Sequence, residues 1–273
     1  MRLFLSICLV MVLFASNTLL TRAGVVAGGD PMTFAALRVA AGAATLCALV
    51  LWRDGWPETF RPSGYWGATT LFIYLVGFSW ANLTLDAGIG AIILFGTVQL
   101  ALFGSVLWRG DAVPTMRWAG MIVAFAGLIW LVWPTQTVRL DLMGVALMVT
   151  GGLGWAGHTL IGQKSSTPLR ASAVNFGLAA IALAPFLFWI ADMPPHVMLL
   201  AVASGALASG LGYALWYAVL PQIDTTTAGV AQLSVPVIAA VGGLLFLSEA
   251  PTWANVAAGC LVLAGIGLSQ IRR

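Results

Sequence analysis

The feature that most constrains this sequence is a succession of apolar runs, each about 20 residues long, extending along the whole chain. An α-helix of that length crosses the ~30 Å hydrocarbon core of a bilayer. Ten such segments are expected, at 3–22, 33–52, 64–84, 87–107, 115–133, 142–161, 172–190, 197–219, 227–247 and 252–270. Because these runs are too long for barrel strands, we predict that all of them are transmembrane helices.

The composition agrees with a chain that is embedded in lipid. Hydrophobic residues make up 60% of the 273 residues and charged residues only 8%, whereas ordinary soluble domains carry about 25% charged residues. The connections between runs are short, so no soluble domain is expected. We read the apolar stretch that follows Met1 as the first span and not as a removed leader. The predicted fold is therefore an all-α, polytopic membrane protein.

Several classes of function find no support in the residue types. The net charge is +3, but the basic residues are scattered singly, so nucleic acid is not an expected partner. Cys8, Cys47 and Cys260 each lie inside an apolar run without a second cysteine or histidine nearby. We interpret them as small buried apolar residues, and we expect neither a metal site nor another cofactor.

The basic residues predict how the chain is oriented. With a cytoplasmic N-terminus, nine of them fall inside, namely Arg2, Arg53, Arg61, Arg109, Arg117, Lys164, Arg170, Arg272 and Arg273. Only Arg22 and Arg139 fall outside, and Arg38 lies within a span. This bias follows the positive-inside rule, so both termini are expected to be cytoplasmic and the number of spans even. The chain is then a multi-pass protein of a bacterial-type inner membrane.

The two halves of the chain, 1–134 and 135–273, are similar to each other. LDAGIGAIILFGTVQL, which begins at Leu85, aligns with IDTTTAGVAQLSVPVI, which begins at Ile223, and this alignment pairs Asp86 with Asp224. An odd number of spans in each half makes the halves insert in opposite orientations. We therefore predict two inverted five-helix repeats, an arrangement common in secondary transporters with a substrate site near mid-membrane.

An ordered set of residues extends this interpretation to a family. It comprises Pro31, Arg38, Asp111, Pro114, Gly120, Trp155, Pro236, Glu249, Pro251 and Gly259. In this set the chain resembles the ten-helix EamA-type exporters of the drug/metabolite transporter superfamily. The resemblance implies an inner-membrane carrier, commonly an exporter of amino acids or related metabolites. Val98 stands where the second half has Pro236, so a particular relative's substrate is not carried over.

Polar and aromatic side chains deep inside the spans are candidates for the substrate path, because a buried polar group in lipid needs a partner. The candidates nearest the span centres are Tyr74, Gln99, Trp155, His158 and Tyr213. The alternative for each is an interhelical hydrogen bond or ordinary packing. Weaker candidates, farther from the centres, are Asn17, Asn82, Asn175 and Gln232.

Three further aromatic residues and one arginine have two readings each. Trp80 and the pair Trp216 and Tyr217 occupy equivalent positions in the two halves, so they form either paired outer and inner gates or plain packing contacts. Arg38 is the one basic residue well inside a span. It either attracts a substrate carboxylate or fixes helix packing as a buried arginine, and packing is the reading that the sequence favours.

Other modes of action remain as alternatives to a carrier. No acidic residue falls near the middle of a span, which favours facilitated transport of a small polar molecule over tight proton coupling. A channel or a structural or sensing membrane protein is the second reading. A membrane-embedded enzyme is less favoured, because His158 and His196 are far apart and no catalytic motif is present. A monomer suffices for the carrier, although the sequence leaves the oligomeric state open.

Overall fold

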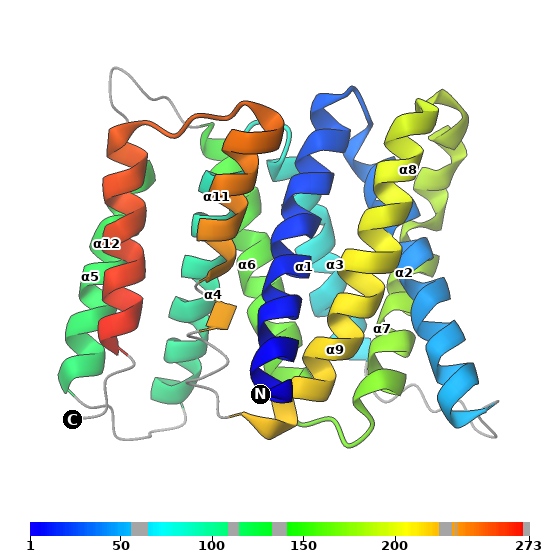
Figure 1. Ribbon diagram of the computed structural model, residues 1–273, viewed down its shortest axis with the longest axis horizontal. Coiled ribbons are helices and arrows are strands. Elements are labelled where there is room, and N and C mark those ends of the chain that lie inside the picture. Colours follow the sequence, from blue (N-terminus) through cyan, green and yellow to red (C-terminus); the bar gives the residue numbers. More distant parts are fainter. Residues whose placement is uncertain (56–64, 109–114, 133–140, 224–230, 233, 270–273) are drawn as a thin grey trace.

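The computed structural model describes residues 1–55, 65–108, 115–132, 141–223, 231–232 and 234–269, and this part of the chain is helical without strands. Figure 1 shows the helices side by side as a bundle. In the first half they are α1 (Arg2–Val26), α2 (Pro31–Asp54), α3 (Tyr65–Ala81), α4 (Ala87–Trp108) and α5 (Thr115–Val132). The second half begins with α6 (Leu142–Gly162) and α7 (Pro168–Leu183) and ends with α11 (Ser234–Leu247) and α12 (Trp253–Ser269).

Two of the predicted spans are helical throughout but change their winding. The 3₁₀-helix η1 (Ala184–Asp192) continues α7. The eighth predicted span runs through α8 (Pro195–Ala203), the π-helix η2 (Ser204–Leu211), α9 (Gly212–Val219) and the 3₁₀-helix η3 (Leu220–Gln222). A π-helix of this length is rare, and such segments concentrate at functional sites.

The surface of the bundle is that of a membrane protein. Six helical segments are long and apolar enough to cross a bilayer, and α11 and α12 are shorter apolar helices. Large apolar side chains such as Leu5, Ile181 and Phe246 are exposed, as lipid-facing residues would be. The prediction that Cys8, Cys47 and Cys260 are buried is wrong, because all three are exposed. A thiol suits lipid contact as well as it suits a protein core.

The ends of the helices define two edges of the bundle. We call the edge with the α1–α2 turn at Gly28 the Gly28 edge, and the opposite one the Arg2 edge. The start of α1 and the end of α12 both lie at the Arg2 edge in Figure 1. Gly28 has φ of 90°, a conformation that glycine adopts without steric cost, so the chain reverses sharply there.

Asp30 and Asp141 start two helices at the Gly28 edge by capping exposed backbone N–H groups. Asp30 accepts hydrogen bonds from the backbone N–H and hydroxyl of Thr33, at 2.7 and 2.9 Å. Asp141 accepts from the N–H of Gly144 at 2.8 Å and from the hydroxyl of Thr84 at 2.9 Å. These bonds hold the pKa of the Asp141 carboxyl below its usual value, and the Thr84 bond ties the end of α3 to the start of α6.

Ion pairs at the Gly28 edge join the end of α11 to α1 and α4. Ser248 has a positive φ of 58°, and the N–H of the next residue, Glu249, donates to the carbonyl of Gly243, so the chain turns back at the end of α11. This turn directs Glu249 toward Arg22, with Nε and Oε1 2.6 Å apart, and toward the N–H of Ala87. Arg22 also pairs with Asp86 at 3.2 Å.

Helices from different halves of the sequence pack against each other. The closest pairs include α3 with α6, α2 with α7, α1 with α11, and α5 with α12 at one side of the bundle. Between α3 and α6 the backbones nearly touch at Gly77, Gly151 and Gly154. A Cβ atom at Gly154 would lie 2.6 Å from the nitrogen of Tyr74. Small residues permit such close approach between helices in membranes.

The observed helices match the expected spans over their common residues, with differences at the ends. The seventh expected span, 172–190, is extended to 168–192 by η1, and the eighth, 197–219, to 195–222. Proline at the first helical position, as at Pro168 and Pro195, accounts for the earlier starts. Several residues used in the sequence argument lie outside the described part of the chain, among them Asp111, Pro114, Arg139 and Asp224.

The close contact between α3 and α6 yields a stability prediction. We expect Gly154→Ala to lower the stability of the detergent-solubilised protein by about 1–3 kcal/mol, because the added methyl group overpacks the contact. The matched control is Gly177→Ala in α7, where a Cβ atom meets nothing within 4 Å. Thermal unfolding should show a lower midpoint for the first variant alone. Equal midpoints for both variants would contradict the packing account.

Candidate functional site

Aromatic side chains from four helices meet in the middle of the bundle. Phe14 comes from α1, Tyr74 from α3, Trp155 from α6 and Tyr213 from α9, and each is at least nine-tenths buried. The ring of Trp155 is the centre of this cluster, with centroid distances of 5.5 Å to Phe14, 5.2 Å to Tyr74 and 5.0 Å to Tyr213. We call these four residues the aromatic cluster.

A small cavity lies within the aromatic cluster. Its volume is about 10 Å³, and Asn17, Thr18, Leu94 and Phe95 complete its lining. That is about the space of one water molecule. The indole N–H of Trp155 donates to Oε1 of Gln232 at 3.1 Å, so another residue of the second half holds the ring in place. The cavity combines aromatic faces with an amide and hydroxyl groups.

Toward the Arg2 edge, the cluster continues into a pair formed by His158 and Tyr217. His158 is buried and stacks on Trp155 with ring centroids 5.8 Å apart. Its Nδ1 lies 3.0 Å from the carbonyl oxygen of Gly67, and its Nε2 lies 2.9 Å from the Tyr217 hydroxyl. A carbonyl oxygen only accepts, so Nδ1 carries the proton and Nε2 accepts from Tyr217. The pair thus joins α6 to α3 and α9.

Trp216, next to Tyr217, is fully buried against Phe14, with centroids 5.8 Å apart. Its indole N–H has no hydrogen-bond partner among the described residues. A buried donor without a partner costs about 1–3 kcal/mol.

Toward the Gly28 edge, the cluster adjoins the buried guanidinium of Arg38. Arg38 has no exposed surface. It donates from Nη1 to Asn17 Oδ1 at 3.2 Å and to the Thr21 hydroxyl at 3.0 Å, and from Nη2 to the Ser79 hydroxyl at 3.3 Å. The face of Phe78 lies 5.3 Å from the guanidinium carbon, a cation–π distance. Every one of these partners is uncharged.

Asn17 connects the arginine to the aromatic cluster. Its Oδ1 accepts from Arg38 and from the hydroxyl of Ser204, the latter at 2.8 Å, and its Nδ2 donates to the Tyr74 hydroxyl at 3.1 Å. Ser204 is the first residue of the π-helix η2. The next residue, Gly205, is so close to Arg38 that a Cβ atom there would collide with the arginine's carbonyl oxygen. The π-helix therefore forms part of the arginine's surroundings.

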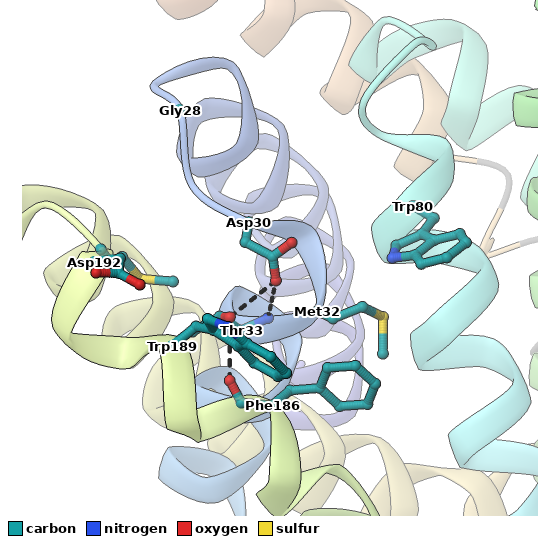
Figure 2. Close-up of a pocket in the computed structure, with 9 residues that line it drawn as sticks. Gly28, Asp30, Met32, Thr33, Trp80, Phe186, Trp189 and Asp192 are labelled. Atoms are coloured by element: carbon teal, nitrogen blue, oxygen red, sulfur yellow. Dashed lines mark hydrogen bonds between the residues drawn. The ribbon is translucent and has the colours of Figure 1, made fainter.

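A second, larger pocket opens at the Gly28 edge, with a volume of about 380 Å³. Figure 2 shows Trp80 of α3 facing Asp30, Trp189 and Phe186 across it. Trp80 is 46% exposed and Trp189 51%. Among the described residues, none lines both this pocket and the central cavity.

Four of the five predicted substrate-path residues come together in the structure: Tyr74, Trp155, His158 and Tyr213. The fifth, Gln99, is buried on α4 but is not among the described residues that line the cavity. Trp216 and Tyr217 lie on the Arg2 side of the cluster, whereas Trp80 lies in the pocket at the Gly28 edge. The gate candidates are thus on opposite sides of the cluster.

Other residues of the site were underrated or missed from the sequence. Asn17 ranked low because it is off-centre in its span, yet it makes three side-chain hydrogen bonds. Phe14, Thr21 and Ser79 were not singled out. The available signal was helical spacing, because Phe14, Asn17 and Thr21 recur on one face of α1, but a sequence does not say which helix that face meets.

The chemistry of the central site suits recognition of a polar solute. It offers aromatic faces, hydroxyl and amide groups and one guanidinium, and these groups bind by stacking and hydrogen bonding. Within the described ranges, no group of three His, Cys, Asp or Glu residues could hold a metal ion. The site lies inside a bundle of apolar helices, so a solute bound there is within the membrane.

Comparisons with known proteins agree on a class of membrane transporters. The profile of the EamA-like transporter family matches residues 142–270. An uncharacterized protein of Pseudomonas aeruginosa is 40% identical over 95% of this chain and 91% of its own length. A protein of Bacillus subtilis that is named as a transporter is 27% identical, over 88% of this chain and 86% of its own length.

Two further matches concern substrate and fold. The threonine/homoserine exporter RhtA of Escherichia coli is 29% identical over 67% of this chain and 63% of its own length. A solved crystal structure covers 98% of this chain and 96% of its own, with a TM-score of 0.67 at 17% identity, which is a likeness of fold alone. The chain is a multi-pass membrane transporter and not an enzyme, and it belongs to the EamA-like family of the drug/metabolite transporter superfamily.

Proposed function

We propose that the chain is a secondary transporter that exports an amino acid or a related polar metabolite across the inner membrane by alternating access. The observation that carries this proposal is the aromatic cluster, which is buried in the middle of the bundle and formed by helices of both halves. A site between two halves becomes reachable from either side when the halves move relative to each other. We assign Tyr74, Gln99, Trp155, His158 and Tyr213 to solute binding.

The proposed substrate class rests on chemistry and on one named relative. Aromatic faces, hydroxyl groups and an amide suit a solute that has both polar and apolar parts, as neutral amino acids have. The relative in Escherichia coli is named as an exporter of threonine and homoserine, which makes these two amino acids the first candidates to test here. Because this relative is only 29% identical over part of the chain, the amino acid transported here can have a different side chain from threonine and homoserine.

The packing of the helices supports two inverted five-helix repeats, 1–134 and 135–273. If the first half is exchanged with the second, the most extensive contacts have counterparts: α1 with α11 corresponds to α6 with α4, and α2 with η2 to α7 with α3. The end of α1 also lies near the start of α6, since Arg22 bonds the carbonyl of Asn82 and Thr84 bonds Asp141. The first helices of the two halves therefore run in opposite directions, as inversion requires.

Alternating access requires the central cavity to widen. Its volume of about 10 Å³ admits no amino acid. The close glycine contacts of α3 with α6, and of Gly205 with α2, are smooth surfaces along which helices can shift. We infer that Trp80 belongs to the gate on the Gly28 side and that Trp216 and Tyr217 belong to the gate on the Arg2 side. A channel would need an open path through the same region.

Transport is the direct test of the proposed function. The purified protein in proteoliposomes should show saturable counterflow of at least one member of a labelled amino-acid panel that includes threonine and homoserine. We expect Trp155→Ala to reduce this flux at least tenfold, because the central ring and its bond to Gln232 are lost. Gln99→Ala tests the fifth assigned residue in the same assay.

The matched control for this assay is Trp253→Ala, which removes a tryptophan that is 88% exposed and should leave counterflow unchanged. Flux without saturation or counterflow would indicate a channel. If Trp155→Ala and Gln99→Ala move every solute as well as the parent does, the assigned binding residues are wrong.

The bond between His158 and Tyr217 yields a separate prediction about stability. Tyr217→Phe leaves His158 Nε2 without its donor, and a buried acceptor without a partner costs about 1–3 kcal/mol. We expect a lower thermal midpoint for this variant. Tyr65→Phe removes a hydroxyl from a residue that is 68% exposed and should have no effect. Identical midpoints for both variants would show that the bond contributes nothing to folding.

The proposed topology of ten crossings with cytoplasmic termini is tested with reporter fusions. Green fluorescent protein fused to either terminus should fluoresce, because it folds in the cytoplasm. Alkaline phosphatase should be active when it is fused after Asp141, at the Gly28 edge, and inactive when fused after Lys164, at the Arg2 edge. Termini on opposite sides of the membrane would rule out an even number of crossings, and an exchange of the two phosphatase results would reverse the orientation.

A further inference from the structure

Arg38 is a buried cation that has no anionic partner among the described residues. Its side chain has no exposed surface. The ion pairs of the described residues involve Arg22, Arg53 and Arg170, and none of them includes Arg38. Asn17, Thr21, Ser79 and the ring of Phe78 supply only neutral dipoles and a π face. Arg22, which joins helices at the Gly28 edge, is paired with two carboxylates. A purely structural role for Arg38 would be compatible with the same kind of pairing, but its described partners are all neutral.

The guanidinium also has an unused donor. Its Nε is buried and has no hydrogen-bond partner among the described residues. A charge inside a membrane protein is costly unless it is paired, and such residues usually mark substrate or ion pathways. A guanidinium presents its N–H groups as a planar fork that fits the two oxygen atoms of a carboxylate. The missing partner is therefore expected to be an anion of that shape.

The position of Arg38 relative to the cavity decides where that anion comes from. Asn17 bonds Arg38 and also lines the central cavity with Tyr74 and Trp155. A solute in the aromatic cluster therefore lies one side chain away from the guanidinium. A lipid headgroup is a poor candidate, because protein covers the arginine on all sides. The anion that can reach it is part of the transported solute.

We propose that Arg38 binds the carboxylate of the transported solute and thereby restricts the substrates to carboxylate-bearing molecules, zwitterionic amino acids among them. This inference rests on the proposed transport function and deepens it. Arg38 holds the carboxylate toward the Gly28 edge, while the aromatic cluster contacts the rest of the molecule. The neutral shell of Asn17, Thr21 and Ser79 keeps the guanidinium in position without neutralising it, so its charge remains available to the solute.

The first experiment uses the unaltered protein and varies the solute. Each labelled amino acid that shows counterflow in proteoliposomes is challenged with unlabelled competitors. These are the amino acid itself, its amide and the corresponding amino alcohol, which both lack the carboxylate. We expect the amide and the alcohol to compete at least tenfold more weakly than the amino acid. No variant is involved, so folding defects cannot affect the result.

The possible outcomes separate the two proposals. If the amide and alcohol compete as well as the amino acid does, the role of Arg38 is wrong while the transport function stands. The same conclusion follows if the only solutes moved are amines, sugars or other molecules without a carboxylate. If nothing in the panel is moved, the proposed transport function fails, and the carboxylate inference fails with it.

The second experiment changes the arginine. We expect Arg38→Gln to reduce amino-acid counterflow at least tenfold and to remove the discrimination against the amide, and Arg38→Lys to lie between this variant and the parent. The matched control is Arg170→Gln, which removes the same charge from an exposed pair with Asp54 and should behave as the parent. A folded Arg38→Gln protein that still discriminates against the amide would overturn the proposal.

A third variant supplies the missing anion from within the protein. Asn17→Asp introduces a carboxylate at the position that lies 3.2 Å from Nη1 of Arg38. If the guanidinium lacks a counter-ion, this variant should raise the thermal midpoint and at the same time abolish the preference for the amino acid over its amide. A packing role for Arg38 predicts that the preference is retained, and that result would count against the proposal.

Discussion

The interior of this bundle is organised around one charged group that water does not reach. The guanidinium of Arg38 is fully buried among helices α1, α2 and α3, and its three side-chain acceptors come from Asn17, Thr21 and Ser79. Lipid offers no hydrogen bonds to a polar group, so the protein must provide them. Meeting this requirement fixes the relative positions of the three helices, and Asn17 extends the same network to Tyr74 and Ser204.

Irregular winding and small residues make this network possible. The π-helix η2 begins at Ser204, and one of its two glycines, Gly205, lies directly against the backbone of α2 at Arg38. A side chain at Gly205 would force the two helices apart and separate Ser204 from Asn17. On the other side of the cluster, glycines bring α6 against α3 and carry Trp155 to Tyr74. The groups that we propose to bind the solute thus lie beside the close helix contacts along which the helices would shift.

Polar and aromatic groups gather at three places between the two edges of the bundle. The pocket with Trp80 and Trp189 lies at the Gly28 edge, Arg38 and the aromatic cluster follow, and the pair of His158 and Tyr217 lies farther toward the Arg2 edge. These places are separated in this structure, since the pocket at the Gly28 edge and the central cavity share no described residue. Ion pairs of Arg22 with Asp86 and Glu249 hold the Gly28 edge together.

The sequence by itself determined the class of fold and three of the four residues of the aromatic cluster, together with His158. Long apolar runs can only be helices in lipid, and a polar or aromatic residue in mid-span stands out against an apolar background, which is how Tyr74, Trp155, His158 and Tyr213 were found. The tertiary structure alone decided which faces meet. It gathered these four residues and left Gln99 outside the described cavity lining, and it exposed the three cysteines to lipid. It also made Asn17 the link between Arg38 and the cluster. The physical reason is that hydropathy fixes the depth of a residue in the membrane, whereas the rotation of each helix about its axis depends on contacts with helices that are distant in sequence.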